Sequence, residues 1–118
     1  MELKRVYSKH FPFKGYLALT LCPWVFIREE YKRVYTAKVD RHETTHALQQ
    51  IETLWILFFI IYGLEYVVKF ILCGFKHKRA YQSISLEQEA YEHEKEFGYN
   101  NVRYHYAWIK YIFSLKEE

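Results

Sequence analysis

Two short apolar runs near the N-terminus, residues 16–21 and 24–28, carry the spacing of β-strands. In the first run leucines occupy every second position, as in a strand whose two faces meet different surroundings. Pro23 separates the runs and suits a turn or a sheet edge, since it cannot donate a backbone hydrogen bond. A third extended piece is expected around residues 34–35. We predict a small antiparallel sheet within residues 1–35.

Helical spacing replaces this alternation further along the chain. Thr36 and Asp40 are both suitable N-caps for a helix whose first part is rich in polar residues. Residues 54–72 are apolar on almost every side, and Gly63 is expected to break or kink this stretch. The pattern therefore predicts a helix with a hydrophobic continuation over residues 36–73.

Two more helices are expected in the last third of the chain. The first, residues 83–97, has a serine cap at its start and is ended by Gly98. The second, residues 100–116, carries apolar and aromatic residues at helical spacing, which favours a stripe facing the core. That stripe consists of Tyr104, Trp108, Tyr111, Ile112 and Leu115. Residues 1–118 are thus expected to form one α+β, mostly helical domain.

The composition narrows the function classes. Hydrophobic residues make up 51% of the chain and aromatic residues 20%, which is enough apolar surface to exclude wholesale disorder. Seventeen Lys and Arg against fourteen Asp and Glu give a net charge of +3, without a dense basic face. Nucleic acid is therefore not an expected partner.

The cysteines and the N-terminal residues indicate the cellular compartment of the protein. Cys22 and Cys73 are the only cysteines and form no Cys-x-x-Cys pair, so neither a disulfide framework nor thiolate zinc ligation is expected. No apolar segment follows the charges of the N-terminal residues, so no secretory signal peptide is expected. These features favour a cytoplasmic location or the cytoplasmic side of a membrane.

The apolar run of residues 54–72 leaves three alternatives open. Its length is close to the roughly 20 residues that cross a bilayer. Glu65 and Lys69 oppose a span, since each costs about 2.5–3.5 kcal/mol near the bilayer centre, although their spacing allows them to pair. The run could instead lie in a soluble core, or rest on a membrane surface beside the basic residues 76–79. Self-association could also cover exposed rings.

The candidate chemistry lies at His42-Glu43-Thr44-Thr45-His46, an H-E-x-x-H pattern in a helical stretch. Residues four apart share a helix face, so both imidazoles can bind one zinc ion at about 2.0–2.1 Å. Glu43 directly follows the first ligand and therefore lies beside the metal. There it can take a proton from the zinc-bound water and deliver it to the leaving amine.

A catalytic zinc site needs a third protein ligand and an open fourth position. The segment Glu87-Gln88-Glu89-Ala90-Tyr91 lies in the predicted helix of residues 83–97, after a connection long enough to fold back. It offers two glutamates, and its residue types alone do not decide between Glu87 and Glu89.

With these two motifs the chain resembles the gluzincin metallopeptidases, in which a glutamate from a later helix joins H-E-x-x-H. It is most similar to members with Glu-x-x-Ala-Asp or Glu-x-Glu-Ala-Asp, which include the membrane CAAX-processing type and the small minigluzincins. Matching on Ala90 implies that Glu87 is the third ligand and that Glu89 points to the far side. The family's aspartate, which supports the zinc site, corresponds to Tyr91, and a phenol cannot carry that charge at pH 7. The resemblance covers about residues 24–93.

The resemblance implies a minimal zincin-like domain that hydrolyses bonds in a peptide or protein substrate. It also implies that a strand before the motif pairs with extended substrate, for which residues 24–28 are the candidate. The alternative is a non-catalytic helical interaction protein, membrane-associated or not, with a structural or vestigial zinc site. The remaining histidines are expected to be structural or exposed, namely His10, His77, His93 and His105.

Overall fold

The N-terminal part of the chain forms a three-stranded sheet in the computed structural model, which describes residues 2–116. The strands are β1 Lys4–Ser8, β2 Ala18–Leu21 and β3 Trp24–Arg28, in the order β1-β3-β2. β2 is antiparallel to β3, as predicted, whereas β1 is parallel to it. The sheet is therefore mixed, and the prediction of a purely antiparallel sheet was wrong.

The third strand was also predicted in the wrong place. The residues before Tyr35 form a 3-10 helix, η1 Glu29–Val34, and β1 supplies the third strand instead. The side chains of β1 are mostly exposed, so its sequence carries no alternation that would reveal a half-buried strand. On the central strand, Val25 and Ile27 are fully buried and pack with Tyr35 to form the core of the sheet.

A long polar helix, α1 Ala37–Glu52, follows the sheet and begins after Thr36, as predicted. The apolar continuation is a separate helix, α2 Ile56–Leu72, bent by 112° from α1. Gly63 lies inside α2, so the prediction of a break at this glycine was wrong. One helical glycine costs only about 1 kcal/mol relative to alanine, which packing of the surrounding helix readily offsets.

The bend between α1 and α2 falls instead on Leu54 and Trp55, whose φ angles are 57° and 58°. L-residues rarely adopt this left-handed region, so other contacts must hold the chain there. The Trp55 backbone N–H donates to the Gln50 carbonyl at 2.7 Å, and its indole N–H donates to the Cys22 carbonyl at 3.2 Å. A contact with the sheet thus helps to set the direction of α2.

The last third of the chain is more broken than predicted. The basic connection after α2 contains a helix, α3 His77–Ser83, and α4 Ser85–His93 ends before the predicted residue 97. In place of one helix over residues 100–116 there are two short elements, α5 Tyr99–Val102 and the 3-10 helix η2 Ala107–Tyr111. Of the predicted stripe, Trp108 is buried with Phe58, Ile84 and Leu86, whereas Tyr104 is exposed.

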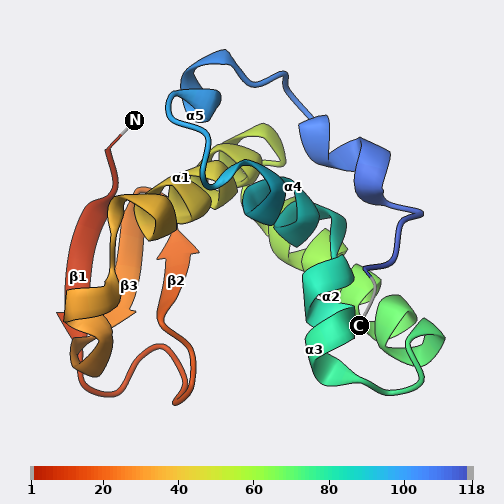
Figure 1. The fold of residues 1–118 in the computed structure, drawn as a ribbon, viewed down its shortest axis with the longest axis horizontal. Coiled ribbons are helices and arrows are strands. Elements are labelled where there is room, and N and C mark those ends of the chain that lie inside the picture. The colour runs from red at the N-terminus through yellow and green to blue at the C-terminus, as the bar shows by residue number, and fades with distance from the viewer. Residues whose placement is uncertain (1, 117–118) are drawn as a thin grey trace.

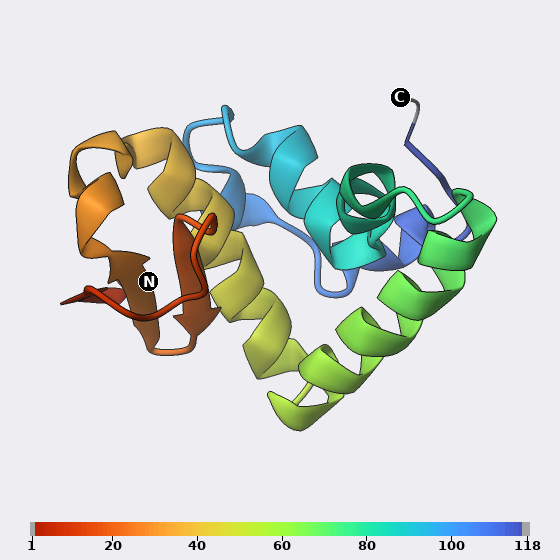
Figure 2. The same ribbon diagram turned by 90° about the horizontal axis from the view of Figure 1, so that it is seen from below.

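The elements are arranged around α1, with the sheet near one end of the molecule and α2 and α3 toward the other (Figure 1). α1 packs against both β2 and α4. Figure 2 shows α1 and α2 as the two arms of a V, with α4 between them. This mostly helical arrangement beside a small sheet confirms the predicted α+β fold class, and it places β2 and α4 beside the H-E-x-x-H helix.

The two charged residues of α2 pair with each other, as their spacing suggested. Lys69 Nζ lies 2.8 Å from Glu65 Oε1; the Lys69 side chain is buried and that of Glu65 is largely covered. Glu65 also accepts hydrogen bonds from the backbone N–H and hydroxyl of Ser85 at the start of α4. Among residues 2–116, no single helix has the length and apolar content of a membrane span, although α1 and α2 together meet that criterion as a bent pair.

Candidate metal centre

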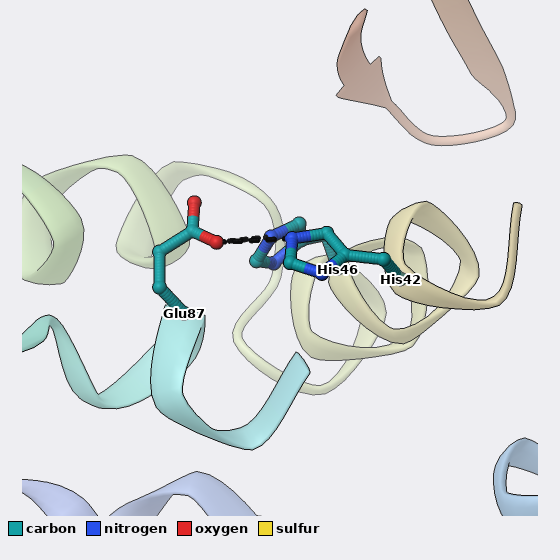
Figure 3. Close-up of side chains that lie close together, drawn as sticks. All are labelled: His42, His46 and Glu87. Carbon is teal, nitrogen blue, oxygen red and sulfur yellow. Dashed lines mark hydrogen bonds and ion pairs between the residues drawn. The ribbon is translucent and has the colours of Figure 1, made fainter. Parts of the chain in front are cut away.

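The three residues predicted to bind zinc lie together in the structure. α1 places His42 and His46 one turn apart on the same face, with ring centroids 4.9 Å apart. α4 packs beside α1 and brings Glu87, in its first turn, to the two imidazoles (Figure 3). All three side chains are buried. The packing of two helices therefore assembles residues that are about forty positions apart.

The ligating atoms are close enough to share one ion. His42 Nε2 and His46 Nε2 each lie 3.1 Å from Glu87 Oε1, and all three candidate ligand atoms lie within 4.8 Å of one another. Two ligands bound at about 2.0–2.1 Å to a tetrahedral zinc ion are about 3.3 Å apart, which these spacings approach. Two imidazole nitrogens and one carboxylate form a donor set typical of catalytic zinc. The residues present therefore fit a zinc ion.

Two further side chains orient these ligands. Gln49 Oε1 accepts a hydrogen bond from His46 Nδ1 at 2.9 Å, which fixes the ring so that Nε2 faces Glu87. The Tyr62 hydroxyl donates to Glu87 Oε2 at 2.5 Å, so Oε1 is the oxygen that faces the histidines. His42 Nδ1 is buried without a hydrogen bond, 3.5 Å from a Glu94 carboxylate oxygen. Such partners fix ligand geometry and raise metal affinity.

The histidines and the carboxylate shift one another's proton affinity. Burial lowers the pKa of His42, but the carboxylates of Glu87 and Glu94 outweigh burial and raise this pKa to about 10. The pKa of His46 is likewise raised, because the Glu87 charge outweighs burial. Burial would raise the pKa of Glu87, but the two imidazoles hold it well below its ordinary value. A metal ion that binds this cluster must displace the protons held by the imidazoles.

The proposed base, Glu43, lies on the wall of the same cavity as His46 and Glu87. The volume of the cavity is about 470 Å³. Glu43 Oε1 accepts a hydrogen bond from the Thr20 hydroxyl of β2 at 2.7 Å. Burial raises the pKa of the Glu43 carboxyl, which makes its carboxylate a stronger base toward a water molecule.

Glu89 and Tyr91 take different roles from Glu87. Glu89 is fully buried and accepts hydrogen bonds from Arg103, Tyr99 and Gln49, so its carboxylate is already engaged outside the ligand cluster. The Tyr91 ring packs edge-on against the His42 ring, with centroids 4.5 Å apart. Tyr91 therefore supports a ligand by packing, at the position where the gluzincin pattern has a charged aspartate.

The strand expected to bind extended substrate is not available for that purpose. Residues 24–28 form β3, which lies in the middle of the sheet and is paired on both sides. The edge strand beside α1 is β2, and Ala18 and Thr20 of this strand line the cavity. The side-chain amide of Gln50 already pairs with the Thr20 carbonyl at 2.6 Å and with the Cys22 N–H at 2.7 Å. The Ala18 end of β2 is therefore the accessible part of this edge.

Three polar residues contribute to the site but were not predicted from the sequence, namely Thr20, Gln49 and Tyr62. Gln49 lies three residues after the second histidine, so helical spacing alone could have placed it on the ligand face. Thr20 and Tyr62 reach the site only through packing, and nothing near them in sequence identifies them. His77 was expected to be structural or exposed. It is exposed, as predicted, and it also lines the cavity and forms a 2.8 Å hydrogen bond with the Tyr66 hydroxyl.

Replacing Gln49 with alanine is expected to weaken zinc binding by about 10–100-fold, because His46 loses the group that fixes its ring. A titration with zinc against a competing chelator measures the change in affinity. Gln50→Ala is the matched control, since Gln50 is an equally buried amide on the same helix that bonds to β2. Equal zinc affinity in the wild-type and Gln49→Ala proteins would contradict this role.

Comparison of the chain with protein-family models, with curated proteins and with solved structures finds no match.

Proposed function

We propose that this protein is a zinc-dependent peptidase in which His42, His46 and Glu87 bind the metal and Glu43 is the general base. The supporting observation is that the three ligand atoms lie within 4.8 Å of one another, and that two of these residues, His46 and Glu87, line the same cavity as Glu43. A structural zinc site typically has four protein ligands and has no use for a general base. Three ligands and an adjacent carboxylate are the arrangement that catalysis requires.

Each residue of the site has a separate role in the proposed hydrolysis of a peptide bond. A zinc ion held by His42, His46 and Glu87 would supply Lewis acidity toward the scissile carbonyl and the attacking water. Glu43 takes a proton from that attacking water and then gives it to the nitrogen of the leaving amine. Thr20 donates a hydrogen bond to Glu43 Oε1, which holds the carboxylate of the proposed base in place. Gln49 and Tyr62 keep His46 and Glu87 aligned throughout.

The cavity also indicates a class of substrate. Aromatic side chains dominate the wall beyond the ligands, and they include Phe58, Phe59, Tyr62, Tyr66 and Tyr81. An apolar wall favours burial of a large apolar side chain. An extended peptide paired with the Ala18 end of β2 would have backbone hydrogen bonds to this strand. We therefore expect cleavage of extended peptides next to a large apolar residue.

The metal content of the purified protein tests the proposal. Wild-type protein equilibrated with zinc at neutral pH and then freed of excess metal is expected to retain about one zinc ion per chain. His46→Ala is expected to retain none, because two ligands do not complete the site. His105→Ala is the matched control, since His105 is exposed away from the cluster. Wild-type protein without zinc after this treatment would contradict the proposal.

The non-catalytic alternative draws its support from a different observation. α2 exposes a broad apolar surface, as expected of a protein that binds a partner. This alternative predicts that zinc, where bound, has a structural role and that Glu43 can be replaced without consequence. The Glu43→Gln variant therefore separates the two functions.

A further inference from the structure

The outward side of α2 is almost entirely apolar and open to solvent. Nine large side chains on this side are between 42% and 72% exposed. They are Ile56, Leu57, Phe59, Ile60, Leu64, Val67, Val68, Ile71 and Leu72. We refer to these nine residues as the α2 face. Contiguous exposed apolar surface of this extent usually marks an interaction site.

The α2 face carries no charge, although α2 contains two charged residues. Glu65 and Lys69 pair on the opposite side of the helix, where Lys69 is buried and Glu65 is largely covered by the protein. The helix thus has one side that packs on the domain through Phe58 and Tyr62, and one that is uncharged. Figure 2 shows α2 along the rim of the molecule, with no other element over its outer side.

The width of the face identifies what can cover it. At about 100° per residue, the arc from Phe59 to Leu72 spans about 220° of the helix circumference. A single packed helix contacts a stripe about 100° wide, so one helix of a partner or of a second copy leaves much of the face exposed. A lipid surface can adapt to the whole arc, because acyl chains and headgroups surround a helix that lies in the interface.

Charged and aromatic residues flank the face at its ends. Exposed Lys76 and Lys78, with partly buried Arg79, follow the C-terminal end of α2, where α3 packs against it. Trp55 precedes the helix and is partly exposed. An apolar helix face flanked by lysine and arginine and by a tryptophan is typical of segments that bind anionic membrane surfaces.

We propose that the α2 face docks on an anionic membrane surface, with α2 lying in the interface and the residues of 76–79 near the lipid headgroups. Phe59 belongs both to the α2 face and to the wall of the cavity. Docking therefore places the cavity wall at the membrane surface. As an extension that rests on the proposed function, peptide segments presented at a membrane surface are the substrates of this site.

Vesicle cosedimentation tests the docking. The full chain is mixed with vesicles of equal parts phosphatidylcholine and phosphatidylglycerol, or with vesicles of phosphatidylcholine alone. We expect binding to the anionic vesicles at least about tenfold stronger than to the neutral ones, with a decrease as salt is added. The double variant Leu64→Glu/Val68→Glu should lose at least about tenfold in binding, since it places two acidic groups on the face.

The matched control is Phe97→Glu/Val102→Glu, which introduces the same charges at exposed apolar positions outside α2. This control is expected to bind anionic vesicles as wild type does. The Glu43→Gln protein should also bind as wild type does, because docking does not use the catalytic site. The experiments can therefore contradict membrane docking without contradicting the proposed catalysis, and the reverse.

Three outcomes would overturn the proposal. The first is equal recovery of the wild-type and Leu64→Glu/Val68→Glu proteins with anionic vesicles. The second is a stable dimer in light scattering that becomes monomeric in this variant while wild type binds no vesicles, which would assign the face to a second copy. The third is wild-type protein that resists extraction from the vesicles by alkaline carbonate, which would indicate a bilayer span. Release of bound protein by carbonate supports surface docking.

Discussion

Replacing Glu43 with glutamine is expected to lower peptide hydrolysis by about 10²–10⁴-fold while zinc remains bound. Glutamine has nearly the shape of glutamate and can still accept the hydrogen bond that Thr20 donates. It cannot take a proton from the attacking water at neutral pH, so the chemical step loses its base. Hydrolysis of a mixed peptide library by the zinc-loaded protein, followed by mass spectrometry, measures the change.

The matched control is Glu92→Gln, an identical replacement at an exposed position on α4 outside the metal-binding cluster. This variant is expected to cleave the same peptides at the wild-type rate. Equal hydrolysis by the wild-type and Glu43→Gln proteins would contradict the role of Glu43. Wild-type protein that binds zinc but cleaves no peptide would instead favour the non-catalytic interaction protein.

Replacing Arg103 with methionine is expected to lower the free energy of unfolding by about 3–5 kcal/mol at neutral pH. Its buried guanidinium donates to Glu89 at 2.7 and 2.8 Å and to Glu52 at 3.1 Å through two nitrogens. Methionine fills similar space but leaves two buried carboxylates without their cation. Urea unfolding in the presence of a chelator measures the loss without a contribution from bound zinc.

The loss of unfolding free energy in Arg103→Met should be larger at neutral pH than at acidic pH. Burial would raise the pKa of Glu89, but the hydrogen bond from Arg103 and those from Gln49 and Tyr99 hold it below its ordinary value. A carboxyl whose pKa is lowered by folding stabilises the protein above its unfolded pKa of about 4.3, and this contribution is lost as the pH falls. The difference between wild type and Arg103→Met should therefore be largest near pH 7 and shrink below about pH 4.

The matched control is Arg33→Met, which removes the same charge from an exposed position in η1. A surface change of this kind is expected to alter the free energy of unfolding by less than about 0.5 kcal/mol. A loss below about 1 kcal/mol in Arg103→Met, or one that does not vary with pH, would contradict the assignment of Arg103 as the partner of Glu89 and Glu52.

Helical periodicity predicted local features of the chain well. α1 begins after Thr36, the first of the two predicted N-caps, and the shared face of His42 and His46 follows from their spacing of four. The convergence of Glu87 with these histidines was implied by family resemblance, through the position of Ala90. Helical spacing, helix capping and the alignment of a short motif depend on residues close together in sequence. They can therefore be predicted from the sequence alone.

Other features depend on contacts between residues distant in sequence. The parallel pairing of β1 with β3 joins two segments that are about twenty residues apart, and the exposed side chains of β1 give no local sign of it. The bend at Leu54 and Trp55 uses backbone angles that these residue types disfavour. The contact between Trp55 and Cys22 helps to hold the bend, whereas Gly63 lies within α2 although glycine disfavours a helix interior.

Local sequence patterns predicted the helical H-E-x-x-H motif and the α+β class, and they limited the candidate third zinc ligand to Glu87 or Glu89. Packing of the whole chain places β2 as the wall beside Glu43, brings Thr20, Gln49 and Tyr62 to the site, and leaves the apolar side of α2 exposed. The physical reason is that a helix or strand pattern fixes which side chains share a face. Which other surface covers that face depends on how the whole chain packs.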